Sequence, residues 1–211
     1  MMDQQNATSF SEILTQLTAT ERTLLSELKE IDLNHSPPTG GWSGGQVLAH
    51  LIKTEQYFHP LFFVAPALGT VPLVLGLFDK INIVLCKLAG LKFIANGEQR
   101  PQGLESLNPD FKGRFVAPSF LRPGKKNYEL ASLIAERTKV RQKTLRHMRR
   151  IGVERLQRLR FSHPELGPLT LLEMFLFISK HEAWHTEQIR RLKKQMNEQG
   201  EPGAGNHHEN Y

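Results

Sequence analysis

Five consecutive residues near the C-terminus, His181-Glu182-Ala183-Trp184-His185, have types and spacing suited to chemistry. Histidines four residues apart in a helix lie on one face, one turn apart, where two imidazoles can hold one metal ion. The letters also match the His-Glu-x-x-His pattern of zinc proteases, whose glutamate is a general base. Glu182 is expected about 100° around the helix from His181, toward the outside, and no third protease-type ligand follows. Protease chemistry is therefore not favoured.

A third histidine, His50, is predicted to face the core from an earlier helix. Ser43 and Gln46 have the spacing of a capping box, and Trp42 precedes the cap as the first half of a hydrophobic staple. His50 follows about two turns later, between Val47 and Leu51 on the apolar side. A lone histidine at such a position is more often a hydrogen-bonded core residue than a metal ligand.

The helix that carries His181 and His185 is predicted to begin at a second capping box, Thr170 with Glu173, and to run to about Met196. Both histidines share a stripe with core residues such as Ile178. Three inward imidazoles are hard to explain without a shared cation, because buried polar groups need partners. Three imidazoles on one divalent ion, at about 2.0–2.2 Å, leave positions open for water or substrate. The sequence shows that each faces inward, not that they converge.

Heptad-like apolar spacing predicts further helices at 9–31 and 127–151, with an irregular connection at 95–126 whose apolar part, 115–118, is expected to dock on the bundle. In the helix at 127–151, Leu130, Ile134, Leu145 and Met148 are expected to face inward, and Lys139, Lys143 and Arg150 outward. The fold class that follows is all-α: a four-helix bundle with a long crossover connection and an extra apolar helical insertion at about 61–96. The bundle is predicted to cover residues 9–196. The polar segment 197–211 is predicted to be a disordered tail, and its His207 and His208 receive no role.

The insertion contains no charged residue between Leu61 and Phe78, a length that reaches the threshold for crossing a membrane. Prolines and glycines interrupt it, however, and lipid does not satisfy a broken helix backbone. We therefore expect no membrane span. The segment is predicted to finish the second helix, turn, and form a buried or interface helix from about Val71 to Phe93, which packs on the bundle or pairs with a second chain as a homodimer. A hairpin that touches a membrane surface is the alternative.

The amino-acid composition and the charge distribution indicate the compartment and the kind of partner to expect. The single cysteine, Cys86, allows no internal disulfide, and no signal peptide is visible, which favours the cytoplasm. The net charge of +6 is concentrated at 137–160, where ten Lys or Arg face one acid, Glu154. Such a run is either a solvated helix face or a surface for an anionic partner. Without a helix-turn-helix or interleaved aromatic residues, no nucleic acid is expected.

Several single residues have two interpretations. Gln188 follows His185 by nearly one turn and is either an orienting partner of a ligand or a buried amide. Tyr57 is a hydrogen-bond donor near the metal or, more commonly, a core tyrosine. Cys86 is expected to be a small core residue. Of the other histidines, His59 is predicted on the opposite side of its helix from His50, and His35, His147 and His163 at the surface or in turns.

Two motifs resemble those of one family. Residues 42–51, WSGGQVLAHL, resemble the second-helix motif of the DinB/YfiT-like superfamily, and residues 167–173 with 181–189 resemble its last-helix motif. The resemblance covers about residues 9–195. It implies a four-helix bundle with a long crossover and a three-histidine metal site, carried over to His50, His181 and His185, with nickel or zinc as the metal. The apolar insertion departs from the compact pattern of the family.

The resemblance also implies a class of activity, since characterised relatives include thiol-dependent transferases and isomerases that act with bacillithiol or mycothiol. The first hypothesis is therefore a metal-dependent enzyme, a transferase or hydrolase, that acts on a small molecule, with a low-molecular-weight thiol as co-substrate. The second is a non-enzymatic binding module that uses the basic 137–160 surface for an anionic partner.

Overall fold

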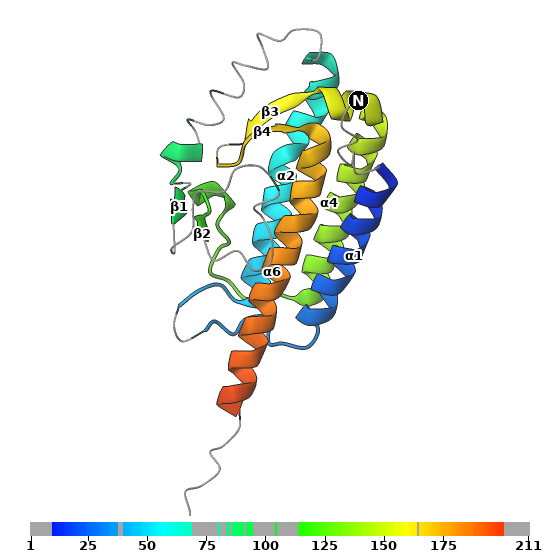
Figure 1. Ribbon diagram of the computed structural model, residues 1–211. Coiled ribbons are helices and arrows are strands. Elements are labelled where there is room, and N and C mark those ends of the chain that lie inside the picture. The colour runs from blue at the N-terminus through cyan, green and yellow to red at the C-terminus, as the bar shows by residue number, and fades with distance from the viewer. Residues whose placement is uncertain are drawn as a thin grey trace, which may run out of the picture.

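Four long helices lie side by side in the computed structural model and form a bundle (Figure 1). The structure describes residues 10–37, 40–68, 80, 84, 86–90, 92–94, 104, 114–163 and 165–200. The four helices are α1 (Phe10–Leu28), α2 (Gly44–Leu68), α4 (Leu130–Ile151) and α6 (Leu171–Gly200). Most described residues are helical, so the all-α prediction is confirmed.

The bundle is organised around α6, which packs against α1 and α2, while α2 also packs against α4 (Figure 1). Two clusters of buried apolar side chains fill the space between the helices. One gathers around Phe62, Phe175 and Met148, and the other around Leu24, Leu48 and Ile189. Because α2 and α6 are neighbours, residues that face inward from both can meet.

Both capping boxes of the helices that carry the three histidines are confirmed. The Gln46 backbone N–H donates to Ser43 Oγ at 3.3 Å, and the Ser43 N–H donates to Gln46 Oε1 at 3.0 Å. At α6 the Glu173 N–H donates to Thr170 Oγ1 at 3.1 Å, and the Thr170 N–H donates to Glu173 Oε2 at 2.6 Å. Each box satisfies backbone donors that the first helical turn leaves unpaired and so fixes where the helix begins.

Gly45 lets the start of α2 approach the segment before α4 closely. A Cβ atom at this position would lie 2.7 Å from the Cβ of Tyr128, a distance that real carbon contacts do not reach. The Gly45 N–H also donates to the Leu33 carbonyl oxygen at 2.8 Å. The first turn of α2 is therefore held against two connecting segments, which sets the depth of the residues that follow it.

Two small two-stranded sheets accompany the helices, and the sequence indicated neither. After Gly152, whose φ of +80° ends α4, come the short helix α5 (Val153–Arg158) and strands β3 (Arg160–His163) and β4 (Gly167–Thr170). These strands are antiparallel, with Phe161 opposite Leu169. Strands β1 (Lys92–Ile94) and β2 (Arg114–Val116) also pair antiparallel, so the helix predicted to end at Phe93 is wrong at that end.

Most of the apolar insertion, and with it most of the helix predicted over 71–93, lies outside the described residues. Its described part includes the end of α2 and residues 86–88, which are helical. Within the described residues, no helix has the length and apolarity to cross a membrane. Pro118, in the predicted docking segment, is buried, and the 3-10 turn η2 (Ser119–Leu121) contacts α2.

The inner face of α4 differs from the prediction. Arg137 and Arg141, counted among the ten basic residues of the 137–160 surface, are buried, with 1% and 4% of their surface exposed. Of the predicted core residues Met148 is buried, whereas Ile134 and Leu145 are only half-buried. The predicted outer residues Lys139, Lys143 and Arg150 are exposed. The helix α4 thus places two charges inside the bundle, and the exposed basic surface is smaller than the sequence indicated.

The ends of the helices also differ from the predictions. The helix α4 begins at Leu130, three residues after the predicted start, and α1 ends at Leu28 rather than Ile31. The helix α6 continues to Gly200, so residues 197–200 are helical although the sequence indicated a disordered tail from Asn197. The rest of that segment lies outside the described residues, as does Ser9, where the first helix was predicted to begin.

Candidate metal centre

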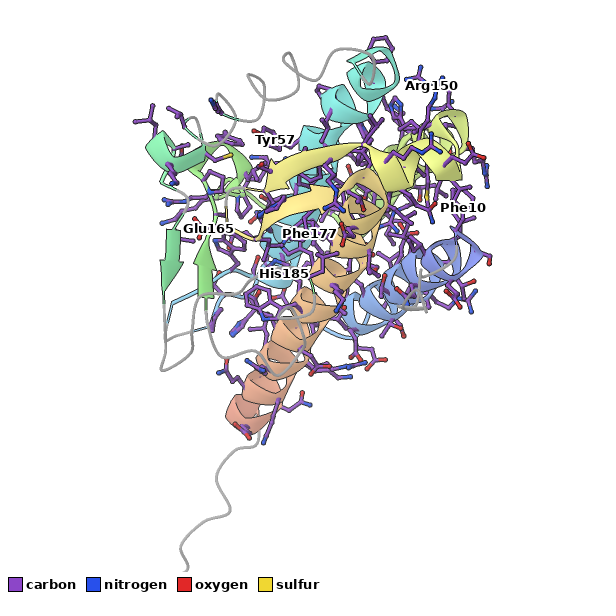
Figure 2. The ribbon with its side chains drawn as sticks, turned by 45° about the horizontal axis from the view of Figure 1, so that its top comes forward. Phe10, Tyr57, Arg150, Glu165, Phe177 and His185 are labelled. Carbon is purple, nitrogen blue, oxygen red and sulfur yellow. The ribbon has the colours of Figure 1, made fainter. Side chains whose placement is uncertain are left out.

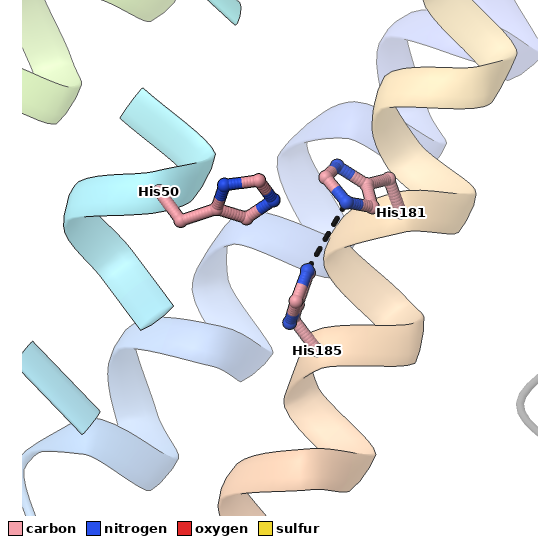
Figure 3. Close-up of side chains that lie close together, drawn as sticks. All are labelled: His50, His181 and His185. Carbon is pink, nitrogen blue, oxygen red and sulfur yellow. Dashed lines mark hydrogen bonds between the residues drawn. The ribbon is translucent and has the colours of Figure 1, made fainter. Parts of the chain in front are cut away.

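His50, His181 and His185 meet between α2 and α6 (Figure 3). Each offers one ring nitrogen, and these three nitrogens all lie within 4.8 Å of one another. The Nε2 atoms of His181 and His185 are 3.1 Å apart, and the His50 ring centroid lies 5.3 Å from that of His181. The convergence that the sequence left open is therefore present, and the three nitrogens are close enough that the group could hold one ion.

Hydrogen bonds orient two of the three rings. The Nδ1 atom of His50 lies 3.0 Å from the Leu121 carbonyl oxygen of η2. That of His185 lies 2.8 Å from Gln188 Oε1, which agrees with the first of the two interpretations of Gln188, an orienting partner of a ligand. A carbonyl oxygen only accepts, so each Nδ1 carries the proton and donates it. The lone pair of each ring is then on Nε2, the atom that a cation would bind.

Burial keeps the three imidazoles neutral. Desolvation lowers the pKa of His50 to about 4 and that of His185 to about 3, against an ordinary value near 6.5. The pKa of His181 is also well below its usual range, because of burial and because two other imidazoles lie beside it. Neutral imidazole is the form that ligates a metal, so the three rings already have the protonation state that binding a cation requires.

Aromatic rings surround the cluster. Trp42 lies 4.7 Å from His50 between ring centroids, and Phe177 stacks on His181 at 5.3 Å. Figure 2 shows Phe177 and His185 along α6, with Phe177 nearer the β3–β4 hairpin. The ring of His163, in that hairpin, lies 5.0 Å from Phe177. Apolar walls of this kind limit access of water and strengthen electrostatic interactions inside the site.

Glu182 is not at the outside of the bundle, so that prediction is wrong. Its side chain is fully buried and forms ion pairs with Arg137 and Arg141 of α4, while Oε2 accepts from the Thr20 hydroxyl of α1 at 2.8 Å. Glu55 of α2 pairs with the same two arginines. The carboxylate of Glu182 is thus committed to a four-helix ion-pair network, which gives no support to a protease-type general base.

The structure also describes the surroundings of the tyrosine, the cysteine and two of the other histidines that the sequence singled out. The Tyr57 hydroxyl contacts the Sγ atom of Cys86 at 3.6 Å, and burial raises the tyrosine pKa, so Tyr57 is poorly suited to acid chemistry. Cys86 is buried, as expected. His147 is buried rather than exposed, and His163 is half-buried, with its Nδ1 accepting from the Glu165 and Leu166 backbone N–H groups.

Sequence reasoning missed Arg137, Arg141 and Glu55 as residues that tie the elements around the site. The sequence signal for them is weak: two arginines lie four residues apart on one helix face, and Glu55 and Glu182 lie at helical spacing from apolar residues of two other helices. Such charges are usually solvent-exposed, because a buried ion must be paired. Only the assembled bundle brings the partners together.

The fold and the site together define a helical bundle whose three convergent, neutral histidines could hold a metal ion between two helices. The model of the DinB superfamily matches residues 13–189, and the chain belongs to this family. No curated protein and no solved structure matches the chain.

Proposed function

We propose that the chain is a divalent-metal-dependent enzyme whose ion is held by His50, His181 and His185. The observation that carries the proposal is the convergence of three neutral imidazoles, two buried and that of His181 half-buried, whose nitrogens lie within 4.8 Å of one another. The Nδ1 atoms of His50 and His185 already donate to protein acceptors, so each of these rings has an Nε2 lone pair that a shared cation can bind. Membership of the DinB superfamily supports the same assignment.

Nickel or zinc is the proposed metal. The donor set consists of imidazole nitrogens, which suit zinc, nickel and copper, whereas magnesium and calcium prefer oxygen ligands. The acid nearest in the chain, Glu182, is paired with two arginines and supplies no oxygen to the site. Three protein ligands also leave coordination positions free, as in catalytic rather than structural sites.

The proposed reaction class is transfer or hydrolysis that uses a thiol or water as nucleophile, with a low-molecular-weight thiol as the favoured co-substrate. The ion, when bound, supplies its charge, which lowers the pKa of a thiol or water that binds it. The chain supplies the surroundings. Leu121 and Gln188 keep protons on the outer nitrogens of two ligands. Trp42 and Phe177 cover the rings and limit competing water.

The metal proposal is tested by elemental analysis of purified protein. The wild type is expected to contain close to one nickel or zinc ion per chain, and His181→Ala and His185→Ala are expected to lose it while keeping their helical content. His35→Ala, outside the site, is the matched control and keeps the ion. Full metal content in a triple alanine variant of His50, His181 and His185 would show that the assignment is wrong.

The reaction proposal needs a separate measurement. Metal-loaded protein is mixed with a low-molecular-weight thiol and an electrophile, and consumption of the thiol is followed with and without the His185→Ala substitution. Acceleration that requires both the metal and His185 supports the transferase hypothesis. Metal binding without acceleration by any thiol would reject the thiol reaction and leave the metal site standing.

A further inference from the structure

A second pocket lies between α2 and α4, whereas the three-histidine site lies between α2 and α6. Its volume is about 560 Å³. The lining residues from α2 are Gln56, His59, Pro60 and Phe63, and those from α4 are Lys139, Val140, Lys143 and His147. The two sites therefore use different sides of α2, and the second is independent of the proposed enzymatic function.

One part of the pocket wall is apolar. Pro60 and Val140 line it, and Phe63 adds a ring that is 63% exposed, which is unusual for so large an apolar side chain. The Arg150 guanidinium lies 5.2 Å from the centre of that ring and donates to the Phe63 carbonyl oxygen at 3.2 Å. The ring is thereby held in place beside the pocket, with its apolar surface available to a ligand.

Another part of the wall is cationic. Lys139 and Lys143 are four residues apart on α4, so both ammonium groups lie on the pocket side of one exposed face. Among the described residues, neither forms an ion pair. No acid is among the lining residues: Glu55 binds Arg137 and Arg141, and Glu136 lies beside the lining, with Oε1 3.5 Å from Gln56 Nε2. The lining itself therefore carries two ammonium groups and no carboxylate.

Two histidines complete the wall. His59 Nε2 lies 2.9 Å from Thr144 Oγ1, and the Thr144 hydroxyl binds Glu55, so His59 donates and its bond is satisfied. His147 differs. Its ring is 8% exposed and lies 5.6 Å from that of His59, and its Nε2 has no hydrogen-bond partner among the described residues. A buried polar atom without a partner is costly, and an acceptor that enters the pocket would satisfy it.

We propose that this pocket binds an amphipathic monocarboxylate. Its hydrocarbon or aromatic body packs against Pro60, Phe63 and Val140, and its carboxylate lies between the Lys139 and Lys143 ammonium groups and accepts from His147 Nε2–H. A free phosphate would match the cations but not the apolar wall. A neutral hydrocarbon would match the wall but leave the charges and the imidazole uncompensated.

The test uses calorimetric titration of the full chain with three probes that separate charge from apolar body: octanoate, octanol and acetate. Octanoate is expected to bind with a stoichiometry of about one. Octanol lacks the carboxylate and acetate lacks the hydrocarbon chain, so each is expected to bind at least about tenfold more weakly. Octanol binding as tightly as octanoate would overturn the proposal, because the cations and His147 would then play no part.

Variants locate the binding. Lys143→Gln and His147→Phe are each expected to weaken octanoate binding about fivefold, in line with the loss of one charged or hydrogen-bonded contact. Arg149→Gln, the same charge change on an exposed residue of α4 that does not line the pocket, is expected to bind as the wild type does. An equal loss in Lys143→Gln and Arg149→Gln would mean that only net charge matters and would refute the site.

A carboxylate can also bind a metal, so octanoate is titrated into His181→Ala as well. Unchanged affinity places the probe in the α2–α4 pocket, and loss of binding places it at the three-histidine site and refutes the proposal. An imidazole proton signal, assigned by its absence in His147→Phe, is expected to shift on addition of octanoate and not of acetate. A signal that does not move would contradict the contact with His147.

Discussion

At the scale of single residues, Gln188 decides which nitrogen of His185 carries the proton. Its Oε1 atom lies 2.8 Å from His185 Nδ1 and can only accept. Replacing it by methionine, which has a similar shape, removes the acceptor and leaves the ring free to turn or change tautomer. We predict that Gln188→Met weakens metal binding about tenfold, the size of effect found for partners of metal ligands.

Competition with a chromophoric chelator measures the metal affinity of this variant, and Lys194→Gln, exposed on the same helix, is the control. Equal affinity in Gln188→Met and the wild type would contradict the role of Gln188.

The depressed pKa values of the histidines predict how stability depends on pH. In the folded, metal-free protein the pKa of His50 is about 4 and that of His185 about 3, while both are near 6.5 in the unfolded chain. Between these values the unfolded state binds more protons, so the stability is fully present above about pH 6.5 and falls as the pH drops toward 4. His59 and His163, each with a pKa of about 4, act in the same direction.

Urea denaturation of the metal-free protein at pH 7, 6 and 5 measures this dependence. Each unit of pKa difference is worth about 1.4 kcal/mol, so the free energy of unfolding is expected to fall by at least about 1 kcal/mol over this range. His50→Phe removes one of the groups and is expected to show a smaller fall. Stability that does not change with pH would show that the imidazoles are solvated rather than buried.

The residues of the candidate site differ in how far the sequence predicts them. His50, His181 and His185 were predicted because helical periodicity places each on an apolar stripe. Periodicity describes one helix at a time, and therefore could not show that three rings converge. Glu182 was placed toward the outside by its angular position on the helix, and Arg137 and Arg141 were counted within the basic 137–160 surface. Their burial depends on pairing across helices, which no single helix shows.

At the scale of elements, the buried ion pairs fix how α6 is turned relative to its neighbours. Glu182 binds Arg137 and Arg141 of α4 and Thr20 of α1, so the adjacent His181 is directed toward α2. Removing one partner of a buried ion pair leaves the other charge uncompensated, at a cost of about 3–5 kcal/mol. We predict that Glu182→Gln lowers the free energy of unfolding by about 3 kcal/mol in chemical denaturation.

The exposed ion pair between Arg190 and Glu27 is the matched comparison. It also joins α6 to α1, with a distance of 2.7 Å, but the arginine side chain is 44% exposed. Because water screens such pairs, Arg190→Gln is expected to cost less than about 1 kcal/mol. If the two substitutions cost the same, the buried network does not hold the helices as described.

Gly45 predicts a second effect on an element, at the start of α2. A methyl group there would lie 2.7 Å from the Tyr128 Cβ, so Gly45→Ala must push α2 away from the segment before α4. Overpacking of this kind costs about 1–3 kcal/mol, which we expect as a lower midpoint in thermal denaturation. Gly124→Ala is the control, because nothing lies within 4 Å of its Cβ position. A Gly45→Ala variant as stable as Gly124→Ala would contradict the close approach.

The elements that depend on local sequence were predicted, and those that depend on distant pairing were not. The Ser43–Gln46 and Thr170–Glu173 boxes act over three residues, so their letters suffice. The β3–β4 hairpin requires Phe161 to pair with Leu169 across a segment that contains Gly167 and Pro168, which by themselves indicate only a turn. Strand β1 likewise exists through its pairing with β2.

At the scale of the whole molecule, the helical bundle follows from the apolar stripes and from membership of the DinB superfamily over residues 13–189. The stripes predict how many long helices pack together, because each must bury one face. They do not determine which helices are neighbours. That α6 lies between α1 and α2 decides that the histidines of α6 meet His50. The assignment of residues 9–196 to one domain stays a proposal.

The last prediction concerns the association of whole chains. Within the apolar insertion, Leu88 is 81% exposed and Val84 is 54% exposed, which is a large apolar surface to leave in water. The sequence indicated that the insertion packs on the bundle or pairs with a second chain. The exposure of these two side chains favours the second alternative. We therefore predict a homodimer that buries them, detected as a concentration-dependent mass in sedimentation experiments.

Leu88→Glu places a charge on this surface and is expected to shift the protein toward the monomer without loss of helical content, because the side chain has few contacts within its own chain to lose. Lys87→Glu, also exposed and adjacent, is the control for charge alone and is expected to dimerise as the wild type does. A wild type that stays monomeric at every concentration would contradict the prediction. So would a Leu88→Glu variant that dimerises equally well, since a buried, unpaired carboxylate at the interface would cost too much free energy for the same contact to persist.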